Sequence, residues 1–230
     1  MLSVRNLKAF YGDFQALFGI DFEVSHGEVV AVIGANGAGK STFLRTVCGL
    51  LKAPRDAVRF QDEPIGGLAP GKIVRRGIAM VPEGRRLFTS LSVEENLLMG
   101  AYARRPGPWN LASVYKLFPI LEQKRHVPST ALSGGQQQMA AIGRGLMSNP
   151  KLLICDEISL GLAPIVVKEI YDALPAICAD GMTVIVVEQD VGVAQRVSTR
   201  LYCFQEGRVS LSGSSAELTR EQVSKAYFGV

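Results

Sequence analysis

The 230-residue chain contains few cysteines and histidines, and their spacing matches no metal site. Its two histidines lie far apart in sequence, and its four cysteines include no Cys-x-x-Cys pair. The cysteines stand mostly among apolar residues, at Cys48, Cys155, Cys178 and Cys203. This distribution favours reduced thiols in a core over disulfide bonds or a bound metal.

Long apolar runs are also missing. No segment approaches the roughly 18 consecutive apolar residues that a membrane-spanning helix needs. The N-terminus lacks the charged and then apolar segments of a secretion signal. We therefore expect a cytosolic chain that reaches a membrane only through partners.

A large excess of either charge is absent as well. The 25 Lys and Arg residues only slightly outnumber the 21 Asp and Glu residues, and they are dispersed rather than gathered into an arm. The charge therefore does not demand nucleic acid as a partner. The denser basic spots are most simply solvated faces, although contact with acidic loops of a membrane partner is an alternative. The length suits one large α/β domain with a substantial core.

A glycine-rich segment, Gly34 to Ser41, fits the phosphate-loop pattern G-x-x-x-x-G-K-[ST]. It follows the strand-like run 29–33 and leads into the helix-like run 42–47. Glycines let the backbone wrap a polyphosphate, and the helix N-terminus adds a favourable dipole. Lys40 is expected on the β- and γ-phosphates and Ser41 on Mg²⁺. The predicted nucleotide-binding residues of this segment are Gly34, Ala35, Asn36, Gly37, Ala38, Gly39, Lys40, Ser41 and Thr42.

A pair of acidic residues follows an apolar run at residues 152–155. Such a run is typical of a strand buried on both faces of a parallel sheet. The run ends in Asp156 and Glu157, whose side chains would point to opposite sides of the strand. We expect Asp156 to bind the Mg²⁺ shell and Glu157 to act as general base on the attacking water. Without the phosphate loop, this pattern would be equally compatible with an ordinary strand end.

Between these elements, residues 132–137 read Leu-Ser-Gly-Gly-Gln-Gln. With the phosphate loop and the acidic strand end, this segment makes the chain resemble the nucleotide-binding subunit of an ATP-binding cassette (ABC) transporter along nearly its whole length. The resemblance implies that two such subunits pack head to tail, so that Ser133 and Gly135 of one close over the γ-phosphate held by the other. Alone, the segment would be an ordinary helix cap.

The expected fold is therefore α/β, a P-loop NTPase core with a mixed central sheet, an antiparallel β subdomain and an inserted helical subdomain. Strand-like segments at 2–4, 18–24, 29–33 and 58–60 suggest an antiparallel sheet, and those at 78–81, 152–155 and 183–187 suggest core strands. A capping box at Ser92 to Glu95 predicts a helix start. We expect one ABC ATPase domain over residues 1–230, with the helical subdomain at about 88–149.

Other family positions follow from the resemblance. Tyr11 falls where the family stacks an aromatic ring on adenine. Glu83 stands where most members have a Gln that senses the γ-phosphate and the metal, Gln189 where they have a His, and Ala163 where they have an Asp. Together these replacements resemble the smaller ATPase of branched-chain amino acid importers. Gln189 can still donate an amide N–H to phosphate, although it cannot take up a proton near neutrality.

Four residues depart even from this branch: Ile158, Gln136, Gly145 and Thr199. Ile158 lacks the fixed φ of the usual Pro, and Gly145 should weaken its helix by about 1 kcal/mol relative to Ala. Neither change removes a catalytic group.

The sequence thus predicts an ATPase that uses ATP and Mg²⁺ to drive solute import, peripheral on the inner face of the cell membrane. Glu157, Gln189 and Lys40 are the expected catalytic residues, and Ser41, Glu83 and Asp156 the expected metal ligands. The resemblance implies membrane permease subunits, a second, non-identical ABC ATPase and an extracytoplasmic solute-binding protein, with no nucleic acid. Alternatives are an importer ATPase for urea, amides or another small solute, and a soluble ABC-type assembly ATPase.

Overall fold

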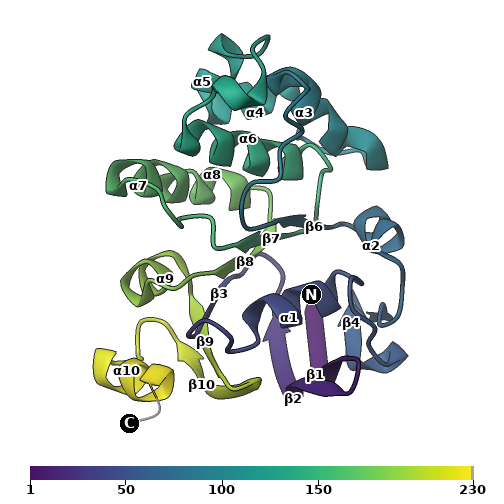
Figure 1. Ribbon diagram of the computed structural model, residues 1–230, viewed down its shortest axis with the longest axis vertical. Coiled ribbons are helices and arrows are strands. Elements are labelled where there is room, and N and C mark those ends of the chain that lie inside the picture. Colours follow the sequence, from purple (N-terminus) through teal and green to yellow (C-terminus); the bar gives the residue numbers. More distant parts are fainter. Residues whose placement is uncertain (229–230) are drawn as a thin grey trace. The chain divides into compact units, whose positions relative to one another are not determined.

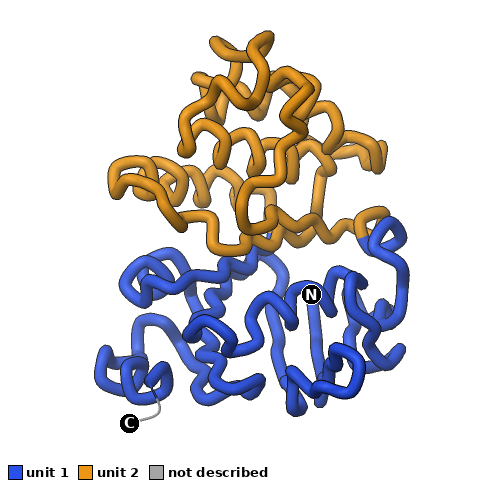
Figure 2. Tube along the Cα trace, viewed as in Figure 1, with its two compact units in different colours: residues 1–73, 183–230 blue, residues 74–182 orange. Residues whose placement is uncertain are grey.

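The computed structural model describes residues 1–228 and divides the chain into two compact units. Unit 1 comprises Met1–Ile73 and the chain from Thr183 onward, and unit 2 comprises Val74–Met182 (Figure 2). Within residues 1–228, no helix is both long and apolar enough to cross a bilayer.

Unit 1 contains an antiparallel sheet with the strand order β2-β1-β4-β5 (Figure 1). Its long hairpin joins β1 (Leu2–Tyr11) to β2 (Phe14–Val24), and the turn uses Gly12 at φ 59°. The short strands β4 (Val58–Phe60) and β5 (Glu63–Pro64) continue the sheet from β1. The hairpin is longer than the predicted segments 2–4 and 18–24. Several register shifts interrupt the regular alternation of buried and exposed residues, which is the pattern by which a strand is predicted.

The same unit contains four further strands in the order β10-β9-β3-β8. Their bounds are β3 Val29–Ile33, β8 Thr183–Val187, β9 Arg200–Gln205 and β10 Arg208–Ser214. β3 runs parallel to both β8 and β9, whereas β10 is antiparallel to β9, which makes this sheet mixed.

The prediction that residues 29–33 join the antiparallel sheet is wrong. β3 lies between two parallel partners instead. The physical reason is the composition of the run, Val-Val-Ala-Val-Ile, which is almost wholly buried and therefore suits the interior of a parallel sheet better than a sheet with one wet face.

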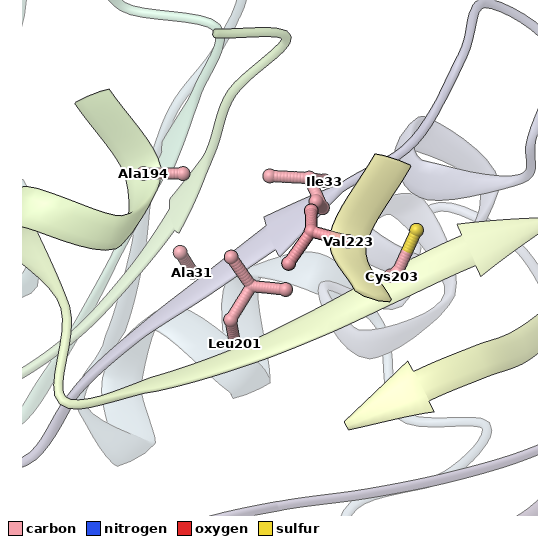
Figure 3. Close-up of a cluster of buried hydrophobic side chains, with 6 residues drawn as sticks. All are labelled: Ala31, Ile33, Ala194, Leu201, Cys203 and Val223. Carbon is pink, nitrogen blue, oxygen red and sulfur yellow. The ribbon is translucent and has the colours of Figure 1, made fainter. Parts of the chain in front are cut away.

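Helices cover this mixed sheet within unit 1. On one side, α9 (Val191–Val197) and α10 (Arg220–Phe228) each place a buried residue, Ala194 and Val223, against β3 and β9. Figure 3 shows these two residues with the strand residues of the cluster, Ala31, Ile33, Leu201 and Cys203. An aromatic cluster joins α1 (Lys40–Val47) to β2 and β9, with ring centroids 4.5 to 5.4 Å apart. The phosphate loop therefore enters a helix that is fixed by core packing.

Unit 2 contains a parallel strand pair and most of the helices. β6 (Ile78–Val81) pairs with β7 (Leu152–Asp156), with Val81 opposite Cys155. The helices are α3 Val93–Gly100, α4 Leu111–Leu117, α5 Pro119–Gln123, α6 Gly134–Leu146, α7 Pro164–Asp172 and α8 Leu174–Cys178. The remaining helical segments of the chain are α2 Pro70–Arg76 and the 3-10 turns Arg55–Ala57, Ala101–Ala103 and Ser129–Ala131.

The predicted helix start at Ser92 is confirmed by a complete capping box with Glu95. Helices α3 to α6 lie within residues 88–149, but unit 2 also includes β6, β7, α7 and α8. A separate helical subdomain with the bounds 88–149, within a single domain over 1–230, stays a prediction.

Candidate functional site

The glycine-rich loop between β3 and α1 has a backbone that other residues adopt with strain. Gly34, Gly37 and Gly39 have φ values of 150°, 81° and 101°. A Cβ on Gly34 would lie 2.4 Å from the carbonyl oxygen of Phe204, whereas a Cβ on Gly37 would meet nothing within 4 Å. Gly34 is therefore needed for packing, and Gly37 presents open backbone to which a polyphosphate can come close.

Lys40 is the first residue of α1 and is only 4% exposed. Its Nζ donates hydrogen bonds to the carbonyl oxygens of Gly34 at 2.6 Å and Ala35 at 3.1 Å. The loop thus curves around the ammonium group while its tip, residues 35–37, stays exposed. A buried cation beneath exposed backbone N–H groups at a helix start fits a bound polyphosphate.

Two hydroxyl residues follow Lys40 in the first turn of α1, and both are partly buried. The hydroxyl oxygens of Thr42 and Tyr11 lie 3.4 Å apart, which ties the end of β1 to the helix start. The Tyr11 side chain is exposed, as is that of Phe14, its cross-strand partner in the hairpin. An exposed aromatic surface beside the phosphate loop suits the stacking of a nucleotide base. Sequence reasoning missed Phe14, although its position three residues past Tyr11, across a two-residue turn, was a usable signal.

Gln189 follows the last core strand, β8. Because β8 and β3 are parallel, with Val187 opposite Val32, their carboxyl ends meet at one edge of the sheet. There the Gln189 Nε2 donates a hydrogen bond to the Asn36 Oδ1 at 3.1 Å. Asp190 then caps α9 by accepting from the N–H of Val193 at 2.9 Å. Unit 1 therefore brings Gln189 to the tip of the phosphate loop.

Three carboxylates lie at or just beyond the carboxyl ends of the strand pair of unit 2. Since Val81 is opposite Cys155 in parallel strands, Glu83 and the pair Asp156 and Glu157 leave β6 and β7 at the same edge. Asp156 is buried, Glu83 is exposed, and Glu157 adopts a left-handed φ of 47°, which is uncommon for a residue with a side chain. Such departures concentrate at functional sites.

In the part of the chain that the structure describes, no three Asp, Glu, His or Cys side chains group closely enough to hold a metal ion by themselves. The carboxylates of Asp156 and Glu83, which leave neighbouring parallel strands at the same edge, fit Mg²⁺, because proteins bind this ion through one or two carboxylates together with water and substrate phosphates.

Residues 132–137, here called the signature segment, contain the start of α6, with Ser133 as its N-cap. The Ser133 Oγ accepts a hydrogen bond from the N–H of Gln136 at 3.3 Å, and the Gln136 Oε1 accepts from the N–H of Ser133 at 3.0 Å. The Gln that departs from the common Glu therefore still completes a capping box. A Cβ on Gly135 would lie 2.4 Å from Cγ1 of Val166 on α7, so this glycine is required for helix packing.

An arginine that sequence reasoning missed fastens the segment after Glu83 to α6. The Arg144 guanidinium donates to the carbonyl oxygens of Arg85 at 2.9 Å and Arg86 at 2.7 Å, both of which have left-handed backbones. It also lies over the Phe88 ring, and burial lowers the pKa of Arg144. No short motif marks this contact, because 58 or 59 residues separate the partners.

The other three departures also have structural accounts. A Cβ on Gly145 would lie 3.1 Å from Cγ2 of Val81 and 3.2 Å from Cδ1 of Leu153, so the glycine lets α6 approach the strand pair closely. Ile158 is buried, and the burial of its apolar side chain stabilises the segment in which the usual Pro is absent. The Thr199 Oγ1 donates to the carbonyl oxygen of Val29 at 3.0 Å.

Unit 1 thus gathers Tyr11, the phosphate loop, Thr42 and Gln189, and unit 2 gathers Glu83, Asp156 and Glu157 at one strand edge. Ser133 and Gly135 stand at the start of α6. The chemical roles of all these residues stay predictions.

Comparison with known proteins confirms the predicted fold. The structure superposes on the ADP conformation of an ATP-binding cassette of an ABC transporter with a TM-score of 0.83 and 29% identity, covering 100% of this chain and 99% of the other. It is similar to a dimeric cassette in a post-hydrolysis state bound to ADP and Pi, with a TM-score of 0.83, 25% identity and coverage of 94% and 99%.

Sequence comparison confirms the predicted resemblance. The chain is 44% identical, over 232 residues and the full length of both, to the high-affinity branched-chain amino acid transport ATP-binding protein BraG of Pseudomonas aeruginosa. It is 30% identical to the probable branched-chain amino acid transport ATP-binding protein LivG of Methanocaldococcus jannaschii, covering 100% of this chain and 97% of the other. The ABC transporter family model matches residues 17–159. With its phosphate loop, acidic strand end and signature segment in that order, the chain belongs to the ABC transporter family.

Proposed function

We propose that this chain is the ATP-hydrolysing subunit of an importer for branched-chain or related amino acids. The observation that carries the ATPase assignment is the phosphate loop, in which the buried Lys40 ammonium lies beneath an exposed glycine-rich backbone. The solute class rests on the full-length likeness to BraG.

Unit 1 supplies the nucleotide site in this proposal. Backbone N–H groups of residues 34–42 and the Lys40 ammonium bind the phosphates, and Tyr11 stacks on the adenine. Gln189, held by Asn36, donates an amide hydrogen bond to the γ-phosphate. These contacts orient ATP for in-line attack by water.

Unit 2 supplies the carboxylates. Asp156 and Glu83, together with Ser41 of unit 1, would hold Mg²⁺, which when bound neutralises charge on the phosphate oxygens. Glu157 orients the attacking water and accepts its proton. The left-handed backbone of Glu157 turns the chain sharply after the buried strand, which supports a site role rather than continued pairing.

The signature segment acts on a partner. Ser133 and Gly135 offer a hydroxyl and a helix N-terminus to the γ-phosphate bound by a second, non-identical ABC ATPase. The pair drives membrane permease subunits, and an extracytoplasmic binding protein delivers the solute. The chain is thus a peripheral protein of the membrane's inner face and has no nucleic-acid partner.

The decisive experiment is Glu157→Gln in the assembled transporter, reconstituted in lipid vesicles. We expect ATP hydrolysis to fall by about 10²- to 10⁴-fold, the range of general base catalysis, while ATP binding is retained. Glu169→Gln removes an exposed carboxylate in the same unit and is the matched control. Normal turnover in Glu157→Gln would refute the assigned base.

A second measurement tests the solute and the alternatives. Vesicles should accumulate leucine, isoleucine or valine when ATP and the binding protein are supplied. Uptake of urea or amides instead would reassign the solute. Isolation of the chain with soluble assembly proteins and no multi-span membrane subunits would contradict an importer.

A further inference from the structure

A pocket of about 350 Å³ lies within unit 2, and none of its lining residues is one of those assigned to ATP. Its walls come from the loop before α4, from α4 and from α8 with the turn that follows it. Pockets for small ligands begin at about 300 Å³, so this volume suits a molecule of amino acid size. The lining residues that matter here are Pro108, Trp109, Lys116, Leu117, Ala176 and Asp180.

One wall is held in place by Asn149. The Asn149 Oδ1 accepts a hydrogen bond from the backbone N–H of Trp109 at 2.7 Å, and the Asn149 Nδ2 donates to the Trp109 carbonyl oxygen at 3.0 Å. The same Nδ2 donates to the carbonyl oxygen of Arg105 at 3.2 Å, at the other end of the loop. This side chain therefore fixes the loop that carries Trp109, so a ligand would meet a preformed aromatic wall.

Two side chains of opposite charge line the pocket, and neither is bonded to another side chain or to the backbone in the described part of the chain. Within residues 1–228, the side chains of Lys116 on α4 and Asp180 after α8 form neither an ion pair nor a hydrogen bond, with each other or with any other residue. Ser113, which also lines the pocket, uses its hydroxyl in the capping box of Asn110. The charges available to a ligand in the pocket are therefore one ammonium group and one carboxylate.

These observations together describe a ligand. An apolar wall of Trp109, Leu117 and Ala176 favours an apolar side chain, and a separated cation and anion complement a molecule that carries both charges. We propose that this pocket binds a small zwitterionic amino acid with an apolar side chain. Asp180 accepts hydrogen bonds from the ligand's ammonium group, and Lys116 pairs with its carboxylate. The pocket shares no residue with the proposed ATP site, so the two proposals can be tested independently.

The chain offers its own probe, because Trp109 is its only tryptophan. We would titrate the full chain with leucine and follow tryptophan fluorescence, with isothermal titration calorimetry as a second readout. The expected result is saturable binding. The analogues 4-methylpentanoate and 3-methylbutylamine, which each carry one of leucine's two charges, should bind about tenfold more weakly, since a hydrogen bond to a charged group contributes about that factor.

Variants assign each charge to one end of the ligand. Asp180→Asn should weaken leucine binding about tenfold and leave 4-methylpentanoate unchanged, whereas Lys116→Gln should weaken both and leave 3-methylbutylamine unchanged. Glu122→Gln and Lys72→Gln remove exposed charges outside the pocket and should have no effect. Ala176→Leu tests the pocket without touching a charge, because the larger side chain fills it and should abolish binding.

Three results would overturn the proposal: no heat and no fluorescence change up to the solubility of leucine, equal affinity for leucine and both analogues, or unchanged leucine binding in all three pocket variants. Affinity for Mg-ATP and the unfolding midpoint, measured on the same samples, show that each variant is folded. They also separate a failure of this site from a failure of the ATPase assignment.

Discussion

Gln189 and Asn36 are joined by a hydrogen bond of 3.1 Å, although 153 residues separate them in the sequence. The amide of Gln189, a predicted γ-phosphate contact, is thus held by the phosphate loop itself. An amide keeps the same charge at all pH values near neutrality. The bond therefore fixes the orientation of Gln189 rather than tuning an ionisation.

We predict that Asn36→Ala lowers kcat about two- to tenfold, the range of one net hydrogen bond, and changes the KM for ATP less. Gln189→Ala, which also removes the proposed hydrogen bond to the γ-phosphate, should lower kcat at least as much. Because Asn36 acts through Gln189, Asn36→Ala combined with Gln189→Ala should cost little more than Gln189→Ala alone. Steady-state hydrolysis by the four proteins gives the answer, and fully additive losses would show that the two side chains act separately.

Arg144 should stabilise the segment that follows Glu83. Its two guanidinium hydrogen bonds to the carbonyl oxygens of Arg85 and Arg86 cannot both be kept by a lysine, which lacks the planar fork. We predict that Arg144→Lys lowers the free energy of unfolding by about 1–2 kcal/mol. It should also speed hydrogen exchange in residues 83–88.

Denaturant unfolding and amide exchange measure both effects. Arg104→Lys is the control, because this exposed arginine lies in the same unit and its side chain forms no hydrogen bond or ion pair with another of residues 1–228. If Arg144→Lys and Arg104→Lys unfold alike, the contact contributes nothing to stability.

The stability of the start of α3 should depend on pH through Glu95. Hydrogen bonds from the backbone N–H and the hydroxyl of Ser92 hold the pKa of Glu95 below its ordinary value of 4.5. A lowered folded pKa means that its stabilisation is complete above the unfolded pKa and is lost as pH falls through the folded pKa. We predict that wild type loses this contribution below pH 4.5, whereas Glu95→Gln does not. Melting temperatures across that range test the prediction, with the exposed Glu122→Gln as control, and parallel curves for wild type and Glu95→Gln would contradict it.

The sequence was sufficient for the features that depend on neighbouring residues. The phosphate-loop pattern, the capping box at Ser92 and the buried run before Asp156 each follow from local spacing, and the structure has a loop, a helix start and a strand at these places. Strand partners are different, because they depend on residues far away in the chain. Residues 29–33 were correctly predicted as a strand but assigned to the wrong sheet.

The candidate site shows the same division. Lys40 and Asp156 could be proposed from patterns within a few residues, since each pattern contains its own chemistry. The clamp of Arg144 and the bond between Asn36 and Gln189 could not, because each joins segments that only folding brings together. The left-handed backbones at Arg85 and Arg86 could not be predicted from the sequence either, since arginine has no preference for that conformation.

Substitution of Gly135 tests how closely α6 packs against α7. A Cβ at this position would lie 2.4 Å from Cγ1 of Val166, so α6 and α7 must separate to accept it. We predict that Gly135→Ala destabilises the chain by about 1–3 kcal/mol, the usual cost of overpacking, although Ala is the better helix former. Gly134→Ala is the matched control, because its Cβ would meet only the flexible end of Arg85, at 3.2 Å.

Val166→Ala removes the obstructing methyl groups and should therefore restore part of the stability lost in Gly135→Ala. Equilibrium unfolding of the single and double variants measures this rescue as a coupling energy. If the unfolding free energies simply add, the steric conflict is absent. Rescue of stability without rescue of ATP hydrolysis in the assembled transporter would separate the packing role of Gly135 from its proposed approach to the partner's γ-phosphate.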